Sequence, residues 1–234
     1  MRSLFRTTVR AVTRPSPGFV RVTVGGPQLR RFAAEGADQR VKVVVPGPGA
    51  SGLGGPEPVP LAEWRARWRA LPDRPALRTY TVAAARPEEL DLDFFVHAAP
   101  GPASAWAPAA RPGEELLISG SDRRAATGPL AVQWAPGAAR RLLVAGDEAA
   151  VPAIRAIVRE TAGDPIVLVA AADPADVLVP GAEHVASLVA ALDRPWPVDY
   201  AWVAGETSQI AEIRRLLAGV PVVQAQGYWT SGPR

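Results

Sequence analysis

The sequence contains no cysteine among its 234 residues and only two histidines, His97 and His184. The lack of cysteine excludes disulfides, iron–sulfur clusters, thiolate zinc sites and a cysteine nucleophile. With so few imidazole groups, a histidine-based metal centre is not expected either. The sequence therefore predicts no metal site.

An excess of one charge sign is also missing, because 26 Lys and Arg residues stand against 23 Asp and Glu residues, a net charge of +3. No run of five like charges and no basic patch interleaved with aromatics occurs, so we expect no nucleic-acid partner. No apolar run is long enough to span a membrane, and Met1–Phe5 leads into polar residues rather than the apolar core of a signal peptide. We expect a cytoplasmic monomer without membrane insertion.

The first half of the chain consists of short alternating apolar and polar runs between glycine and proline turns, which is typical of antiparallel strands. Several such short runs in sequence favour a small barrel. The predicted strands are Leu4–Val12, Phe19–Val24, Val41–Val45, Leu77–Ala83, Leu92–Ala98 and Leu116–Ser119.

The longest gap between these strands begins with Pro46–Pro60, which is rich in glycine and proline and almost free of charge. This composition predicts a loop of low order. A short helix over Leu61–Leu71 follows, with Trp64 and Trp68 four residues apart on one face. We interpret both tryptophans as a cover for the barrel; a partner or substrate surface is the alternative.

The second half changes to strands that alternate with helices, and its strands are apolar runs without alternation. This pattern predicts a mostly parallel sheet covered on both faces. The change near 134–140 divides the chain into predicted domains 1–134 and 140–234. The predicted strands are Leu142–Ala145, Ile166–Ala171, Tyr200–Ala204 and Val220–Gln224, and the predicted helices are Ala149–Glu160, Ser187–Leu192 and Ser208–Leu217.

The segment Arg78-Thr79-Tyr80-Thr81 lies on a predicted strand, so Arg78 and Tyr80 share one face. A guanidinium grips phosphate with two hydrogen bonds, and a tyrosine ring packs against a flat ligand. Thr81 adds a hydroxyl or a main-chain bond. The alternative is structural, because tyrosine and threonine are good strand formers.

A second candidate ligand-binding segment begins at His97, at the end of a predicted strand. It continues as a turn and a short helix through Gly101-Pro102-Ala103-Ser104-Ala105-Trp106. The N–H groups at a helix start bind pyrophosphate, and the Ser104 hydroxyl would add a donor. Equally, Pro102 occupies a common first-turn position and Ser104 acts only as a cap. His97 alone is more often a structural hydrogen-bonding residue than a catalyst.

In the second half, two loops leave strand ends at Gly146-Asp147-Glu148 and at Gly205-Glu206. Both loops are expected at the carboxyl edge of the parallel sheet, where open α/β sheets bind nucleotides. The Gly-x-Gly-x-x-Gly dinucleotide fingerprint is absent. Asp147 and Glu148 would repel a phosphate placed directly on them, and acids also occur in a first helical turn for dipole reasons.

Six motifs occur in an order that resembles one family: Arg-x-Tyr-Thr (78–81), Asp-Phe-Phe-Val-His (93–97), Gly-Pro-Ala-Ser-Ala-Trp-Ala (101–107), Ala-Gly-Asp-Glu-Ala-Ala-Val-Pro-Ala-Ile (145–154), Trp-Val-Ala-Gly-Glu (202–206) and Gly-Tyr-Trp (227–229). The chain resembles the siderophore-interacting proteins of the ferredoxin–NADP reductase superfamily over nearly its whole length. This resemblance implies an N-terminal six-stranded antiparallel Greek-key β-barrel that binds FAD and a C-terminal α/β domain that binds NAD(P)H.

The resemblance also implies the activity: electrons pass from NAD(P)H through FAD to iron(III) in a bound siderophore, and iron(II) is released. This activity requires no catalytic acid or base, because the flavin supplies the chemistry. A non-catalytic relative that binds siderophore or flavin, or a flavin reductase with another acceptor, is the alternative. The implied FAD contacts are Arg78, Tyr80, Thr81, Val82, Phe95, Val96, His97, Pro102, Ala103, Ser104, Trp106, Tyr228 and Trp229; those to NAD(P)H are Gly146, Asp147, Glu148, Gly205 and Glu206; and those to the ferric siderophore are Arg123 and Arg124.

The sequence departs from the family pattern at several positions. Ala83 replaces a common second arginine, Ala149 replaces a threonine, and Ser121-Asp122-Arg123 stands where Gly-Pro-x-Gly is usual. Thr230-Ser231 follow Trp229 where basic residues are common. These losses would weaken FAD binding, and the choice between NADH and NADPH stays open.

Overall fold

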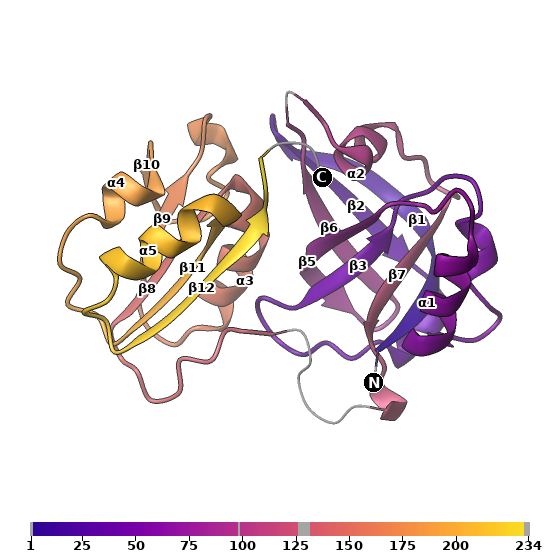
Figure 1. Cartoon of the computed structure of the whole chain (residues 1–234), viewed down its shortest axis with the longest axis horizontal. Coiled ribbons are helices and arrows are strands. Elements are labelled where there is room, and N and C mark those ends of the chain that lie inside the picture. The colour runs from indigo at the N-terminus through magenta and orange to yellow at the C-terminus, as the bar shows by residue number, and fades with distance from the viewer. Residues whose placement is uncertain (1, 98, 126–131, 232–234) are drawn as a thin grey trace. The chain divides into compact units, whose positions relative to one another are not determined.

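A computed structural model describes residues 2–97, 99–125 and 132–231, and the chain divides into two units, Met1–Val132 and Gln133–Arg234 (Figure 1). Ala98, the last residue of one predicted strand, lies outside the described residues. Among the described residues, no helix has both the length and the apolar character needed to cross a bilayer.

The first unit is a closed antiparallel barrel. Its strand order is β2-β6-β5-β3-β7-β1, and β1 also pairs with β2 and so closes the ring. Buried and exposed side chains alternate along the strands of this barrel. Val20, Val22 and Val24 are buried, whereas Arg21 and Thr23 between them are partly exposed. The six strands are β1 (Arg2–Ser16), β2 (Phe19–Gly25), β3 (Arg40–Val44), β5 (Leu77–Arg86), β6 (Glu89–Phe95) and β7 (Glu115–Ser121). The predicted six-stranded barrel is confirmed.

Helix α1 (Leu61–Ala70) covers one side of the barrel. Trp64 is completely buried in a small cluster with residues such as Leu4 and Leu117 of the barrel strands. The indole of Trp68 donates a hydrogen bond to the Pro75 carbonyl at 2.8 Å. Both tryptophans therefore serve the packing, as the covering interpretation expects. The two-residue strand β4 (Val59–Pro60), which the sequence did not indicate, pairs with β1 beside this cluster.

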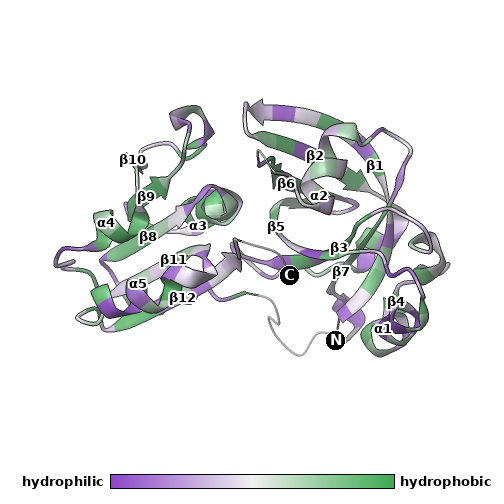
Figure 2. Ribbon diagram, turned by 45° about the horizontal axis from the view of Figure 1, so that its top comes forward, coloured by the Kyte–Doolittle hydropathy of each residue, from purple (hydrophilic) through white to green (hydrophobic). Residues whose placement is uncertain are grey.

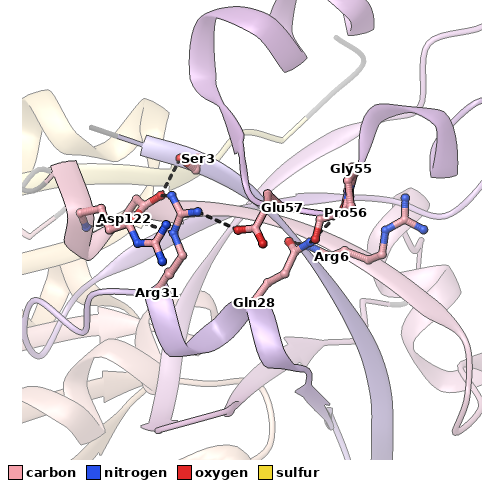
Figure 3. Close-up of polar contacts among 9 residues, drawn as sticks. Ser3, Arg6, Gln28, Arg31, Gly55, Pro56, Glu57 and Asp122 are labelled. Atoms are coloured by element: carbon pink, nitrogen blue, oxygen red, sulfur yellow. Dashed lines mark hydrogen bonds and ion pairs between the residues drawn. The ribbon is translucent and has the colours of Figure 1, made fainter.

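The expectation of low order for Pro46–Pro60 is wrong, because side chains distant in sequence hold this loop (Figure 3). The Gln28 amide donates to the carbonyls of Gly55 and Pro56 at 2.9 and 3.0 Å. Arg31 donates to Glu57 in the same loop at 3.0 Å and to Asp122 at 2.5 Å. Composition alone does not show these partners.

The second unit is a five-stranded parallel sheet in the order β10-β9-β8-β11-β12. Figure 2 shows β8 and β9 largely in the hydrophobic colour, as strands buried on both faces require. Helices α4 and α5 lie on one face and α3 on the other (Figures 1 and 2). The elements are β8 (Leu142–Asp147), α3 (Val151–Glu160), β9 (Ile166–Ala170), β10 (Glu183–Val185), α4 (Leu188–Leu192), β11 (Tyr200–Glu206), α5 (Ile210–Leu216) and β12 (Val222–Trp229).

Two details of this sheet differ from expectation. Strand β10 was not predicted, because its three residues are too few to show a pattern. Strand β12 continues five residues past Gln224, the predicted end, to Trp229. The register shifts near this end, because Gly205 of β11 pairs with Gly227 and Glu206 pairs with Trp229, which leaves Tyr228 as the extra residue on β12. Tyr228 and Trp229 therefore belong to the sheet.

Candidate functional site

Three aromatic side chains join the two segments of the first unit that were expected to share a ligand. The Tyr80 ring of β5 packs against Phe94 of β6 with 4.2 Å between ring centroids. Phe94 in turn meets Trp106 of α2 (Pro102–Trp106) edge-to-face at 5.7 Å. Phe94 is completely buried, and the other two rings are partly exposed. Strand β5 and helix α2 are thereby fixed beside one another at the barrel core.

Arg78 lies two residues before Tyr80 on β5, so both side chains are directed to this same face. The Arg78 guanidinium is partly exposed and donates to the Leu77 carbonyl at 3.1 Å. Burial raises the pKa of Tyr80 to about 12, against the opposing effect of the Arg78 charge. The phenol is therefore neutral at physiological pH. Thr81 and Val82, the next two predicted contacts, are buried in the barrel wall.

Helix α2 begins with Pro102, directly after Gly101. Its first intrahelical bond runs from the Ala105 N–H to the Gly101 carbonyl at 2.9 Å, so the N–H groups of Ala103 and Ser104 precede the helical ladder. The Ser104 hydroxyl was expected to be a donor to a ligand. In this structure it donates to the Gly101 carbonyl at 3.2 Å, within the turn that begins the helix.

Phe95, Val96 and His97 lead from the end of β6 toward α2. The Phe95 ring packs against Phe19 at 5.2 Å and against His97 at 4.9 Å. The Val96 N–H donates to the Gly18 carbonyl at 2.8 Å. The imidazole of His97 is exposed. This stretch is therefore anchored through Phe95 and Val96, and His97 presents its ring to solvent.

In the second unit, Asp147 at the end of β8 is the centre of a hydrogen-bonded group. Its Oδ2 accepts from the Trp229 indole at 2.6 Å, and its Oδ1 accepts from the Ala149 N–H at 3.0 Å. A Cβ atom on Gly205 would lie 3.0 Å from Asp147 Oδ2, so glycine is what allows this approach. Burial raises the pKa of Asp147 to about 6, although the Trp229 hydrogen bond acts in the opposite direction.

The other residues expected around the electron donor lie at the same edge of the sheet. Glu148 accepts from the Ala172 N–H, after β9, at 2.8 Å. Glu206, at the end of β11, accepts from the Ser231 hydroxyl, which lowers the pKa of Glu206. Tyr228 packs edge-to-face against Trp202 at 6.1 Å. The residues of this unit that are predicted to contact the electron donor therefore lie at the carboxyl ends of β8 and β11, next to the end of β12.

Arg123 and Arg124 follow β7 and are exposed. Arg123 donates to the Phe32 carbonyl at 2.8 Å and lines a cavity of about 360 Å³ together with Arg30, Phe32, Ala34, Ala85, Arg86 and Pro87. Ala85 and Arg86 end β5, whereas Arg78 stands near its start, roughly 25 Å away at the usual rise of a strand. The structure therefore does not bring Arg123 together with Arg78. Within the described residues, no cluster of acidic and imidazole groups suits a metal ion.

The departures from the family pattern have structural counterparts. Asp122 is buried and accepts hydrogen bonds from Arg31, from the Ser3 hydroxyl and from the Arg124 N–H. At Ala149 the main-chain N–H donates to the Asp147 carboxylate, which caps the helical turn that follows β8. Ala83 is buried in the barrel wall, so no charge occupies this position.

Two elements of the site were missed from the sequence. Phe94 links Tyr80 to Trp106, yet in the alternating strand β6 it is one of several buried apolar residues, and its contacts with segments distant in sequence carry no local signal. The bond between Asp147 and Trp229 joins residues 82 positions apart. Only the alternation of strands and helices, which places strand ends on one edge, indicates their proximity.

Comparison with known proteins identifies relatives of this arrangement. A family model described as a siderophore-interacting FAD-binding domain matches residues 8–125, half of the chain. The NADPH-dependent ferric-chelate reductase of Escherichia coli is 38% identical over 114 residues, which are 48% of this chain and 42% of that protein. The mycobactin import ATP-binding/permease protein IrtA of Mycolicibacterium thermoresistibile is 33% identical over 177 residues, 66% of this chain and 19% of that protein. The chain thus spans less than half the length of either relative.

Among solved structures, a siderophore utilization protein from T. fusca matches with a TM-score of 0.78 at 25% sequence identity. The match covers 100% of this chain and 95% of that chain. The likeness includes both the barrel and the parallel sheet.

Proposed function

The chain belongs to the siderophore-interacting FAD-binding family, and from this membership we propose that it is an NAD(P)H-dependent ferric-siderophore reductase. The observation that carries the proposal is the contact of Tyr80 with Phe94 and of Phe94 with Trp106. These contacts keep β5, which carries Arg78, beside α2. A ligand with both a ring system and a diphosphate needs two such neighbouring segments.

The residues present fit FAD. We infer that the Arg78 guanidinium and the N–H groups of Ala103 and Ser104 hold the diphosphate, because these are charge-assisted and main-chain donors of the kind that phosphate prefers. The Tyr80 ring packs on the isoalloxazine, and its phenol stays neutral. When bound, FAD accepts two electrons as a hydride and releases them singly. The remaining proposed contacts are Thr81, Val82, Phe95, Val96, His97, Pro102 and Trp106 from the barrel unit and Tyr228 and Trp229 from the sheet unit.

We place NAD(P)H at the carboxyl ends of β8 and β11, with Gly146, Asp147, Glu148, Gly205 and Glu206 as its contacts. The strand order reverses between these two strands, and open α/β sheets bind nucleotides at such a point. The substrate proposal is an anionic ferric siderophore bound through Arg123 and Arg124. One NAD(P)H reduces two iron(III) ions to iron(II) and releases one proton, so electrons and charge balance.

The test begins with the absorbance spectrum of the purified chain after addition of FAD and removal of excess. We expect bound flavin, anaerobic reduction of that flavin by NADH or NADPH, and its reoxidation by a ferric chelate with formation of iron(II). Failure to retain FAD at all would overturn the proposal. Retained FAD that no ferric chelate reoxidises would favour the non-catalytic binding relative, and reoxidation only by other acceptors would favour a flavin reductase.

A further inference from the structure

Two carboxylates from different loops meet the main chain just after β9. Glu148, in the turn that follows β8, reaches across to this loop, and its Oε1 accepts from the Ala172 N–H at 2.8 Å. Asp173 Oδ1 accepts from the Ala175 N–H at 2.8 Å and so caps the turn at Pro174–Asp176. Both carboxylates are thereby fixed at the carboxyl end of β9.

The sequence around this loop supplies no lysine or arginine. Residues 171–186, which follow β9 and include β10, contain three acids and one histidine but neither of these bases. His184 is hydrogen-bonded through Nε2 to the Ala171 carbonyl at 2.8 Å. Because a carbonyl only accepts, this nitrogen carries the proton, and Nδ1 is an acceptor in the neutral ring. Two main-chain donors and the imidazole donor are therefore already engaged, next to a negative charge.

Each of the two carboxylates keeps one oxygen for a ligand. Among the residues that the structure describes, neither Glu148 Oε2 nor Asp173 Oδ2 receives a hydrogen bond. Both side chains reach solvent, Glu148 in part and Asp173 fully. A carboxylate oxygen accepts hydrogen bonds and cannot donate them. It therefore suits a hydroxyl group, which donates, and not a phosphate oxygen, which is also an acceptor and carries the same charge.

The position of these carboxylates in the sheet indicates which part of a dinucleotide they meet. The proposed crevice lies at the ends of β8 and β11, and β9 is the other neighbour of β8. In such sheets an acid after the second strand accepts the ribose hydroxyls of NADH, whereas the 2′-phosphate of NADPH needs an arginine nearby. We propose that Glu148 and Asp173 select NADH over NADPH, because they accept the ribose hydroxyls and repel the 2′-phosphate. This inference rests on the proposed use of NAD(P)H and names which of the two donors is used.

Calorimetry of the FAD-loaded chain with NAD⁺ and NADP⁺ measures the selection without turnover, since neither nucleotide carries a hydride to transfer. The two differ only in the 2′-phosphate, and we expect NAD⁺ to bind at least tenfold more tightly. The ratio should shrink as salt is raised from about 50 to 500 mM, because salt screens repulsion between exposed charges. Equal binding, or tighter binding of NADP⁺, would overturn the inference and retain the proposed donor site. Failure of both nucleotides to bind would contradict the donor site itself.

Isosteric variants test whether the two carboxylates cause the selection. In Glu148→Gln and Asp173→Asn the amide oxygen can still accept the main-chain N–H, so the loop keeps its hydrogen bonds while the charge is lost. Combined, the two changes should tighten NADP⁺ binding at least fivefold and reduce the preference for NAD⁺ to less than about threefold. The matched control is Asp164→Asn, at an exposed acid before β9 at the opposite edge of the sheet, and it should leave both affinities unchanged. A preference that the double variant retains in full would assign it to the shape of the loop and overturn the inference.

Discussion

Arg31 donates from Nη2 to Asp122 Oδ2 at 2.5 Å and from Nη1 to Glu57 Oε2 at 3.0 Å, so one guanidinium serves two carboxylates in different environments. The Asp122 side chain is 2% exposed, whereas that of Glu57 is 75% exposed. Burial alone would raise the pKa of Asp122, but the hydrogen bonds from Arg31 and the Arg124 N–H hold it below its ordinary value. The buried ion pair joins the turn after β2 to the end of β7.

Asp122→Asn should therefore lower the free energy of unfolding by roughly 3 kcal/mol at pH 7, because it leaves the Arg31 charge without its buried partner. Glu57→Gln, the matched control on the same guanidinium, should cost less than about 1 kcal/mol because its carboxylate is solvated. Urea denaturation followed by circular dichroism measures both values. Equal losses would show that burial does not distinguish the two carboxylates.

The sequence predicted the elements whose periodicity is local and missed the contacts that join distant positions. Alternating apolar and polar residues in Phe19–Val24 and apolar runs such as Leu142–Ala145 identify strands, since neighbours in sequence determine which face is buried. The pairing of Arg31 with Asp122 spans 91 positions. No local pattern encodes this pairing. None encodes the bonds from Gln28 and Arg31 to the loop at Pro46–Pro60 either, which span 26 to 28 positions, and for that reason the loop was wrongly expected to have low order.

The same distinction holds for the candidate site. The two-residue period of a strand predicts that Arg78 and Tyr80 share one face. The rule that parallel strands end at one edge of the sheet predicts that Asp147 and Gly205 lie near each other. The position of Arg123 does not follow from such a rule, because it depends on where the end of β7 lies along the length of the barrel, which is beside the end of β5 rather than beside Arg78 at its start. The Trp229 bond to Asp147 joins the ends of two strands that are not neighbours in the sheet, so no local pattern predicts it.

Tyr80 should contribute its ring rather than its hydroxyl to FAD binding. Tyr80→Phe keeps the packing on Phe94 and should change the FAD dissociation constant less than about twofold, whereas Tyr80→Ala should raise it at least tenfold. Because burial raises the pKa of Tyr80 to about 12, the affinity of the unmodified chain should show no contribution from this phenol between pH 7 and pH 9. Fluorescence titration of the flavin-free chain at both pH values measures these constants. A tenfold loss in Tyr80→Phe would assign the role to the hydroxyl.

Gly146 should not tolerate a side chain. A Cβ there would lie 2.8 Å from the Ala204 carbonyl oxygen and would overlap the Ala150 methyl group. Gly146→Ala should therefore destabilise the chain by about 1–3 kcal/mol. Gly219→Ala, where a Cβ meets no atom within 4 Å, should change stability by less than about 0.5 kcal/mol. Thermal unfolding measures the stability of both variants. An unchanged stability of Gly146→Ala would mean that β8 and β11 can separate without an energetic cost.

Asp147 should make stability fall as pH rises from about 4 to 6. Burial raises its folded-state pKa from 3.8 to about 6. The folded chain therefore binds a proton more tightly than the unfolded chain does. Its contribution is complete below the unfolded pKa and is lost as the pH rises through the folded one. Two pKa units correspond to at most about 3 kcal/mol. Asp147→Asn should remove this slope from urea unfolding measured at intervals between pH 4 and pH 7.

Two further variants test whether the slope belongs to Asp147. Trp229→Phe removes a hydrogen bond that lowers the Asp147 pKa, so it should extend the loss of stability to higher pH. Asp199→Asn is the control, because hydrogen bonds from the side chain and main chain of Arg141 lower the pKa of Asp199 to about 2. Its contribution has the opposite sign and is lost only as the pH falls below about 4. An unchanged slope in Asp147→Asn would therefore assign the proton uptake to another buried acid.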